Sequence, residues 1–262
     1  TRPVSPIRFT HALVRSPSPS VVDGLRAIDG PDPDFDCFVA EHGEYCLALE
    51  RAGLAVEMTA ELPAFPDAVF VEDAALCIGN HAVVLRPGAP SRAGEAVAIQ
   101  LDLSSRFRTM ETVTDGCVDG GDILVTASEI IVGRSARTNS AGVMARAAAA
   151  RPSGIPLRSV DTPADVLHLK TDCAIIDEGT IFSTRRLAAS GCFEEYNVIL
   201  CPDGEEPAAN LIRVNDVVIM RTGFPETTAL LESNGYQVDL VQADEAALID
   251  GGLSCMSLRC AW

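Results

Sequence analysis

The feature that most constrains the fold of this chain is a repeated pair of short apolar runs joined by a tight turn. Four copies occur within the 262 residues, at 70–88, 121–135, 167–185 and 209–223. Turn residues of the kind that hairpins use, mostly Asn, Asp and Gly, separate the two runs, and an arginine ends the second run. Four such hairpins at regular spacing predict a fold built from one repeated unit.

Each hairpin is followed by a helix-like segment and then by one more short strand. The periodicity of apolar residues predicts helices over 35–51, 91–106, 138–151, 185–195 and 225–234. The third strands are expected at 54–58, 107–111, 155–159, 197–200 and 236–240. There are therefore five helices and five third strands for four complete hairpins.

The fifth hairpin is divided between the two ends of the chain. Residues 254–259 have the pattern of a first strand, and residues 11–15 have the pattern of its partner. Joining the two termini in one unit closes a ring and removes exposed sheet edges. The sequence therefore predicts an α/β fold, a five-bladed α/β propeller of five strand-strand-helix-strand units, with residues 1–262 forming a single domain. An ordinary mixed sheet with helices on its faces is the alternative.

Composition excludes several classes of protein. A formal net charge of -17 argues against nucleic acid or an anionic membrane as a partner, because both require basic patches. No apolar run approaches the roughly 20 residues of a membrane span. The nine cysteines include no Cys-x-x-Cys pair and no zinc-type cluster, which favours reduced thiols in a cytoplasmic protein without a metal or other cofactor.

Polar residues recur near the start of the first strand of each unit, where a purely structural strand would be apolar. In a ring these strands lie nearest the axis, so their polar side chains are expected to meet there. The residues concerned are Glu72 and Asp73, Asp119 and Asp122, His168 and Lys170, Asn210, and Cys255.

Cys255 follows the pair Gly251-Gly252, which indicates a close approach of the backbone to another group. Of the four histidines, only His168 occupies an equivalent position. A thiol, an imidazole and several carboxylates suit attack on a planar cationic carbon, since carboxylates hold a guanidinium by paired hydrogen bonds. The structural alternatives are a buried apolar cysteine, a hydrogen-bonded core histidine, and solvated or turn-forming acids.

The sequence resembles the dimethylarginine dimethylaminohydrolase family of the guanidine-modifying pentein superfamily. The resemblance spans nearly the whole chain and implies a five-bladed α/β propeller that hydrolyses methylated arginine to citrulline. It rests on the segments 66–73, 86–92, 119–122, 135–139, 167–171 and 249–259.

The resemblance also implies a role for each residue of the site. It makes Cys255 the nucleophile, His168 the acid and then the base, and Asp119 and Asp73 the acids that hold the guanidinium. Arg92 and Arg137 would bind the α-carboxylate of the substrate. Asp67 and the backbone of Leu25 and Ile249 would contact its α-amino end. Phe70 and Glu72 would form a supporting wall. Leu25 lies on a loop that could act as a lid.

Three other interpretations remain open. The first is an arginine deiminase of the same superfamily, although those enzymes usually carry an inserted helical domain. The second is a non-catalytic five-bladed scaffold that binds a macromolecule, which does not require Cys255 and His168 to coincide. The third is zinc binding at Cys255, which we expect to be inhibitory. A homodimer is compatible with the resemblance.

Overall fold

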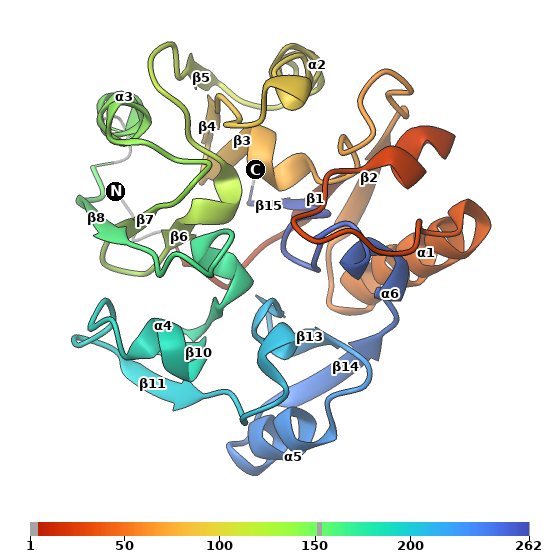
Figure 1. Cartoon of the computed structure of the whole chain (residues 1–262). Coiled ribbons are helices and arrows are strands. Elements are labelled where there is room, and N and C mark those ends of the chain that lie inside the picture. The colour runs from red at the N-terminus through yellow and green to blue at the C-terminus, as the bar shows by residue number, and fades with distance from the viewer. Residues whose placement is uncertain (1–4, 151–153, 262) are drawn as a thin grey trace.

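The computed structural model describes residues 5–150 and 154–261, without the side chains of residues 148–150. Five three-stranded sheets surround a common centre (Figure 1). In each sheet the middle strand runs antiparallel to the first strand and parallel to the third. In the order first, middle and third strand, the sheets are β3 (Ala75–Ile78), β4 (His81–Val84) and β5 (Thr109–Thr112); β6 (Ile123–Val125), β7 (Ile130–Arg134) and β8 (Leu157–Asp161); β9 (Cys173–Asp177), β10 (Thr180–Ser183) and β11 (Asn197–Leu200); β12 (Ile212–Val214), β13 (Val217–Arg221) and β14 (Gln237–Val241); and β15 (Leu258–Cys260), β1 (His11–Arg15) and β2 (Ala55–Thr59).

The predicted pairing of the two ends of the chain is confirmed. His11 lies opposite Cys260 in the antiparallel pair of β1 and β15, and opposite Ala55 in the parallel pair of β1 and β2. The N-terminal strand is thus the middle strand of a sheet whose first strand comes from the C-terminus. The five-bladed α/β propeller predicted from the repeat is the observed fold.

The longer helices lie at the periphery of the ring (Figure 1). They are α1 (Phe35–Arg51), α2 (Glu95–Leu103), α3 (Ser140–Ala150) and α5 (Pro225–Ser233), with the short α4 (Arg185–Ala188) and α6 (Asp244–Ala247) closer in. Asp34 caps α1 by accepting a hydrogen bond from the backbone of Cys37 at 2.8 Å. Phe38, Tyr45 and Leu49 recur on one face of α1 and are buried against the last sheet.

Two predicted helices are shorter in the structure. The segment 185–195 is helical only to Ala188, because Gly191 takes a positive φ of 78° and turns the chain. The segment 91–106 begins as a 3-10 turn, Pro90–Arg92, and becomes α-helical at Glu95. The predicted end of the third helix, at residue 151, lies outside the described residues.

The first strands also begin later than predicted. The residues before β3, β6, β9 and β12 form 3-10 turns, Val71–Ala74, Gly120–Asp122, Leu169–Thr171 and Glu206–Ala209, and residues 253–256 form a turn before β15. Backbone groups in these turns bond to the neighbouring blade instead of to their own sheet. Glu72 donates its N–H to the carbonyl of Cys255 at 3.1 Å, and Gly121 donates to Asp73 Oδ1 at 2.9 Å. The polar residues expected on strands therefore lie on these turns.

Candidate active site

The turns that precede β3, β6 and β9 meet at the centre of the ring, and two glycines make this approach possible. A Cβ on Gly120 would lie 1.8 Å from the carbonyl oxygen of Glu72. A Cβ on Gly121 would lie 2.8 Å from the imidazole of His168. Since no side chain fits at either position, the Gly-Gly sequence allows the carboxylates of one turn to reach the histidine of another.

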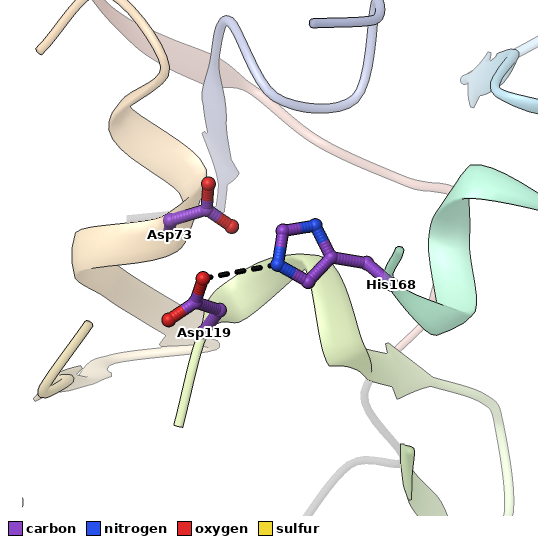
Figure 2. Close-up of side chains that lie close together, drawn as sticks. All are labelled: Asp73, Asp119 and His168. Carbon is purple, nitrogen blue, oxygen red and sulfur yellow. Dashed lines mark hydrogen bonds and ion pairs between the residues drawn. The ribbon is translucent and has the colours of Figure 1, made fainter. Parts of the chain in front are cut away.

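Asp119 is fully buried and holds His168. Its Oδ2 lies 3.0 Å from Nε2 of His168, as the dashed line in Figure 2 shows. The other oxygen, Oδ1, accepts a hydrogen bond of 2.6 Å from the backbone of Gly88. Because both carboxylate oxygens have partners, Asp119 fixes the orientation of the imidazole ring.

Asp73 is the second carboxylate beside His168 (Figure 2). Its Oδ2 pairs with Nη1 of Arg92 at 2.6 Å, and its Oδ1 accepts from Gly121. Burial acts to raise the pKa of Asp73, but Arg92 and then His168 outweigh burial and lower the pKa to about 2. Asp73 is therefore ionised at any pH at which the protein is expected to work.

His168 carries a proton at neutral pH. Burial alone would lower its pKa, yet the charge of Asp73, the hydrogen bond to Asp119 and the charge of Asp122 together raise the pKa to about 9. Asp122 itself is bonded to the hydroxyls of Ser135 and Thr138, both at 2.6 Å, so it supports the site from behind. The pair of Asp119 and His168 is thus an imidazolium held by a carboxylate.

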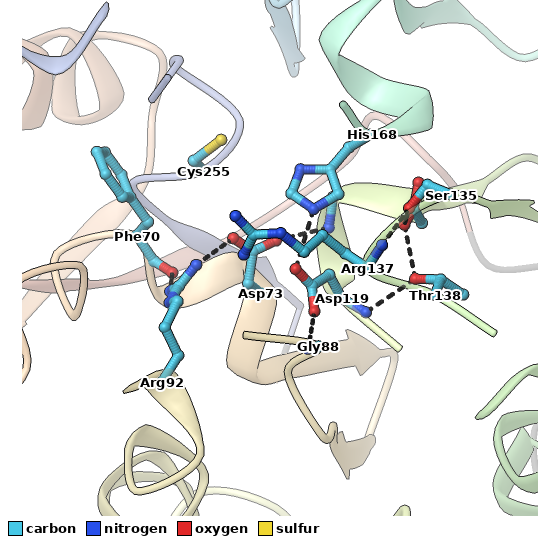
Figure 3. Close-up of polar contacts among 12 residues, drawn as sticks. Phe70, Asp73, Gly88, Arg92, Asp119, Ser135, Arg137, Thr138, His168 and Cys255 are labelled. Carbon is cyan, nitrogen blue, oxygen red and sulfur yellow. Dashed lines mark hydrogen bonds and ion pairs between the residues drawn. The ribbon is translucent and has the colours of Figure 1, made fainter. Parts of the chain in front are cut away.

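Cys255 lies across the site from Asp119, next to the ring of Phe70 (Figure 3). A Cβ on Gly251 would lie 2.3 Å from the Phe70 ring, and one on Gly252 would lie 2.4 Å from the side chain of Asn210. The two glycines therefore serve close approach, as the sequence suggested. Burial, Asp73 and Glu72 raise the pKa of the Cys255 thiol to about 12, so the resting thiol is protonated.

A cavity of about 30 Å³ lies between these groups. Nine residues expected at the site line it, namely Leu25, Asp67, Phe70, Asp73, Arg92, Arg137, His168, Ile249 and Cys255. Sequence reasoning missed Leu167, Asp250 and Gly251, which also line the cavity. Leu167 and Asp250 adjoin predicted site residues in the sequence, and Gly251 was interpreted only as a point of close backbone approach, so adjacency was the available signal.

Two expected residues do not line this cavity. Asp119 is fully buried and reaches the site through its contact with His168. The carboxylate of Glu72 turns away and accepts hydrogen bonds from Lys170 and from Arg259, the latter at 3.3 Å. Glu72 thus separates the site from the far side of the ring.

The two arginines of the site differ in their surroundings. Arg92 is buried, and Asp73 and Glu95 engage its guanidinium at 2.6 and 2.7 Å. Arg137 is half-buried, and its guanidinium makes no hydrogen bond within residues 5–150 and 154–261. Asp67 accepts a hydrogen bond of 2.9 Å from the backbone of Leu25, which fastens the loop at 20–25 over the cavity.

Asp73, Asp119 and His168 each offer one ligand atom to a common point, with these atoms within 4.8 Å of one another. Arg92 already pairs with Asp73, and the His168 nitrogen facing Asp119 shares a hydrogen bond with it. The ligand atoms of this group are therefore already engaged by protein partners, and Cys255 is not part of the group. The prediction of zinc at Cys255 stays a prediction.

Comparison with known proteins identifies the family. No family model matches the chain. The chain is 36% identical over 254 residues to the N(G),N(G)-dimethylarginine dimethylaminohydrolase of Pseudomonas aeruginosa, covering 96% of this chain and 99% of that protein. The chain belongs to the dimethylarginine dimethylaminohydrolase family. A protein of the same name from Streptomyces coelicolor is 31% identical over 95% of this chain and 96% of its own length.

Solved structures of the dimethylarginine dimethylaminohydrolase family agree with this fold. One from Pseudomonas aeruginosa, a cysteine-to-serine mutant complexed with citrulline, has a TM-score of 0.92 and 34% identity, covering 97% of this chain and all of the other. The N-terminal domain of the arginine dihydrolase ArgZ, at 20% identity and a TM-score of 0.85, shares only the fold. The prediction of an enzyme of this family, an amidine hydrolase acting on a C–N bond, is confirmed.

Proposed function

We propose that this protein hydrolyses the guanidinium group of N-omega-methylated arginines, asymmetric dimethylarginine and monomethylarginine, to citrulline and dimethylamine or methylamine. The observation that carries the proposal is the convergence of Cys255, the imidazolium of His168 and the ionised Asp73 on one small cavity. The names of the relatives in Pseudomonas aeruginosa and Streptomyces coelicolor support the choice of substrate.

The charges of the site suit a cationic substrate. The guanidinium would lie beside Asp73, and its positive charge would favour the thiolate of Cys255, which the free site disfavours. The Cys255 proton is lost to solvent and the thiolate adds to the guanidinium carbon, forming a C–S bond. His168 then gives its proton to the departing amine as the C–N bond breaks, leaving a thiouronium on Cys255.

The second half of the reaction uses His168 in its neutral form. It takes a proton from water, and the hydroxide adds to the thiouronium carbon. The C–S bond then breaks as the hydroxyl proton passes to the departing sulfur, which releases neutral citrulline and restores the Cys255 thiol. Asp119 keeps the imidazole aligned for both transfers through its 3.0 Å contact. Asp119 therefore serves as a positioning residue in this scheme.

The amino-acid end of the substrate requires the outer part of the cavity. Arg137 is free to bind the α-carboxylate, together with Arg92, while Asp67 and the backbone of Leu25 and Ile249 face the α-amino group. A volume of about 30 Å³ holds no more than a water or two, so the cavity must widen before substrate enters. Release of the bond from Leu25 to Asp67 would open the loop at 20–25 as a lid.

The decisive experiment measures citrulline formed from asymmetric dimethylarginine, monomethylarginine and arginine. We expect turnover of the methylated substrates by the wild type and none by Cys255→Ser, while Cys201→Ser, which changes a buried cysteine outside the site, stays active. Turnover by Cys255→Ser would contradict the proposed mechanism. Arginine as the best substrate would favour a deiminase. Failure of an amidine electrophile to label Cys255 would favour the interpretation as a non-catalytic five-bladed scaffold.

Three further expectations belong to this proposal. Zinc would inhibit by binding Cys255, which a chelator should reverse in the citrulline assay. A homodimer would appear in sedimentation velocity at about twice the mass of the 27.7 kDa chain. We also place the reaction in the cytoplasm. In the part of the chain that the structure describes, no helix is long and apolar enough to cross a membrane.

A further inference from the structure

A second and larger cavity, of about 620 Å³, lies on the other side of Glu72 from Cys255. The first strands β3, β6, β9 and β15 and the segment at residues 5–9 line it. Among the described residues, none lines both this cavity and the cavity at Cys255. Glu72 and Lys170 form part of its wall, whereas the nearby Asp73 and His168 line the site. Its volume falls in the range of small-molecule binding sites, about 300 to 1,000 Å³.

The charge of this cavity is opposite to that of the protein. Among the residues that the structure describes, Arg8, Lys170 and Arg259 line it and Glu72 is the one acidic lining residue. Arg8 also pairs with Asp216 at 2.8 Å, so an excess of one positive charge remains when this ion pair is counted. The chain as a whole has a formal net charge of -17. A cationic cavity in so acidic a protein favours an anionic occupant.

The two central cations are already fixed in place. Lys170 and Arg259 both bond to Oε1 of Glu72, and their side chains are 12% and 14% exposed. Oε2 of Glu72 is buried without a hydrogen-bond partner among the described residues. One carboxylate thus faces two cations. Lys170 can donate further hydrogen bonds, since its ammonium group has three N–H donors.

The remaining walls are mainly apolar. Phe9, Leu76, Leu124, Val125 and Ile175 contribute to them. We propose that this cavity binds a small organic anion with an apolar body, such as a medium-chain or aryl carboxylate, whose carboxylate is held by Lys170 and Arg259. This inference is independent of the reaction proposed above, because it concerns a separate cavity and is tested by binding.

The wall of the cavity is connected to the segment that carries Cys255. Glu72 donates its N–H to the carbonyl of Cys255, and Nη1 of Arg259 donates to the carbonyls of Ser254 and Ser257 on either side of it, at 3.3 and 3.2 Å. An anion on Lys170 and Arg259 also adds negative charge near the thiol. We therefore expect occupancy of the cavity to slow alkylation of Cys255.

Three probes of one chain length test the binding. Titration calorimetry on the full chain is expected to give one site for octanoate, weaker binding of 1-octanol and no binding of octylammonium. Raising the ionic strength should weaken the binding of octanoate but not the binding of 1-octanol. Equal affinity for octanoate and octylammonium, or no binding of octanoate, would overturn the proposal.

Two variants locate the site. Val125→Trp fills the cavity from β6 and should weaken octanoate binding about tenfold or more, whereas Val97→Trp, on the exposed face of α2, should leave binding unchanged. Arg8→Glu should weaken the binding of octanoate several-fold and have little effect on the binding of 1-octanol. Folding is checked by circular dichroism. Equal octanoate affinity in Val125→Trp and Val97→Trp would overturn the location.

The connection to Cys255 has its own measurement. The rate of iodoacetamide alkylation at the peptide containing Cys255, followed by mass spectrometry, should fall when octanoate saturates the wild type. In Val125→Trp the same octanoate concentration should have no effect. A wild-type rate unchanged by saturating octanoate would overturn the link through Glu72.

Discussion

The groups around Cys255 oppose ionisation of its thiol. Burial comes first, followed by the charges of Asp73 and Glu72, and together they raise the pKa to about 12. The alkylation rate of Cys255 should therefore keep rising with pH up to at least pH 10 instead of levelling near neutrality. Asp73→Asn removes one of these charges and frees that of Arg92, so it should speed alkylation at pH 8 several-fold. A wild-type rate that levels off below pH 7 would contradict this account.

His168 should make the stability of the fold depend on pH. Its pKa is raised from about 6.5 in the unfolded chain to about 9 in the folded protein. The stabilisation is then fully present below pH 6.5 and is lost as the pH rises through 9, with a size on the order of 3 kcal/mol. Urea unfolding between pH 6 and 10 should show this loss in the wild type.

Asp119→Asn provides the matched test for His168. The amide keeps the shape of the side chain but removes its charge, so the pKa of His168 should fall and the loss of stability should shift to lower pH. We also expect turnover to drop about 100-fold or more, because the imidazole is less well held and less often protonated. The same pH profile in variant and wild type would show that Asp119 does not set the charge of His168.

Most residues at the site could be predicted, but not the direction in which each side chain points. Cys255, His168 and Asp73 were recognised because reactive groups recur at one position of each repeat. Glu72 occupies the same position, yet its carboxylate faces Lys170 and Arg259 from two other blades. A pattern along the chain contains no information on such contacts between blades.

At the scale of elements, the starts of the first strands were placed too early for a related reason. The segment from Phe70 to Ala74 adjoins an apolar run and was included in the predicted strand. In the structure it forms a 3-10 turn, in which Asp73 donates back to Phe70 and Glu72 donates to Cys255 in another blade. Middle strands such as β4 were predicted well, because their apolar residues pack inside their own unit and its neighbour.

The crowding of these turns gives an element-scale prediction. Gly120→Ala would place a Cβ 1.8 Å from the backbone oxygen of Glu72, so the turns before β3 and β6 must separate. We expect a loss of about 2 to 4 kcal/mol in the free energy of unfolding. In Gly179→Ala, in the turn between β9 and β10, the added Cβ meets nothing within 4 Å, so the free energy of unfolding should change little. Similar urea midpoints for the two variants would rule out the close packing of the turns.

At the scale of the whole molecule, ring closure was predictable because the two termini supply the two strands that one unit lacks. The structure shows what the closure contributes. Leu13 is fully buried opposite Leu258 and packs with Val84 and Ile99 of the next blade. The strand β1 therefore joins the last blade to the first and holds the segment before β15 on which Cys255 lies.

Closure predicts that the position of the chain ends is unimportant as long as β1 stays paired. Deleting residues 11–15 should abolish both cooperative unfolding and turnover, because β2 and β15 lose the strand between them. A circular permutant that joins the present ends and opens the exposed turn at Gly204, where a Cβ would meet nothing within 4 Å, should keep both. Opening the chain inside β10 is the control and should fail, since it breaks a middle strand. Full turnover in the deletion, or an unfolded Gly204 permutant, would show that the ring is not what holds Cys255 in place.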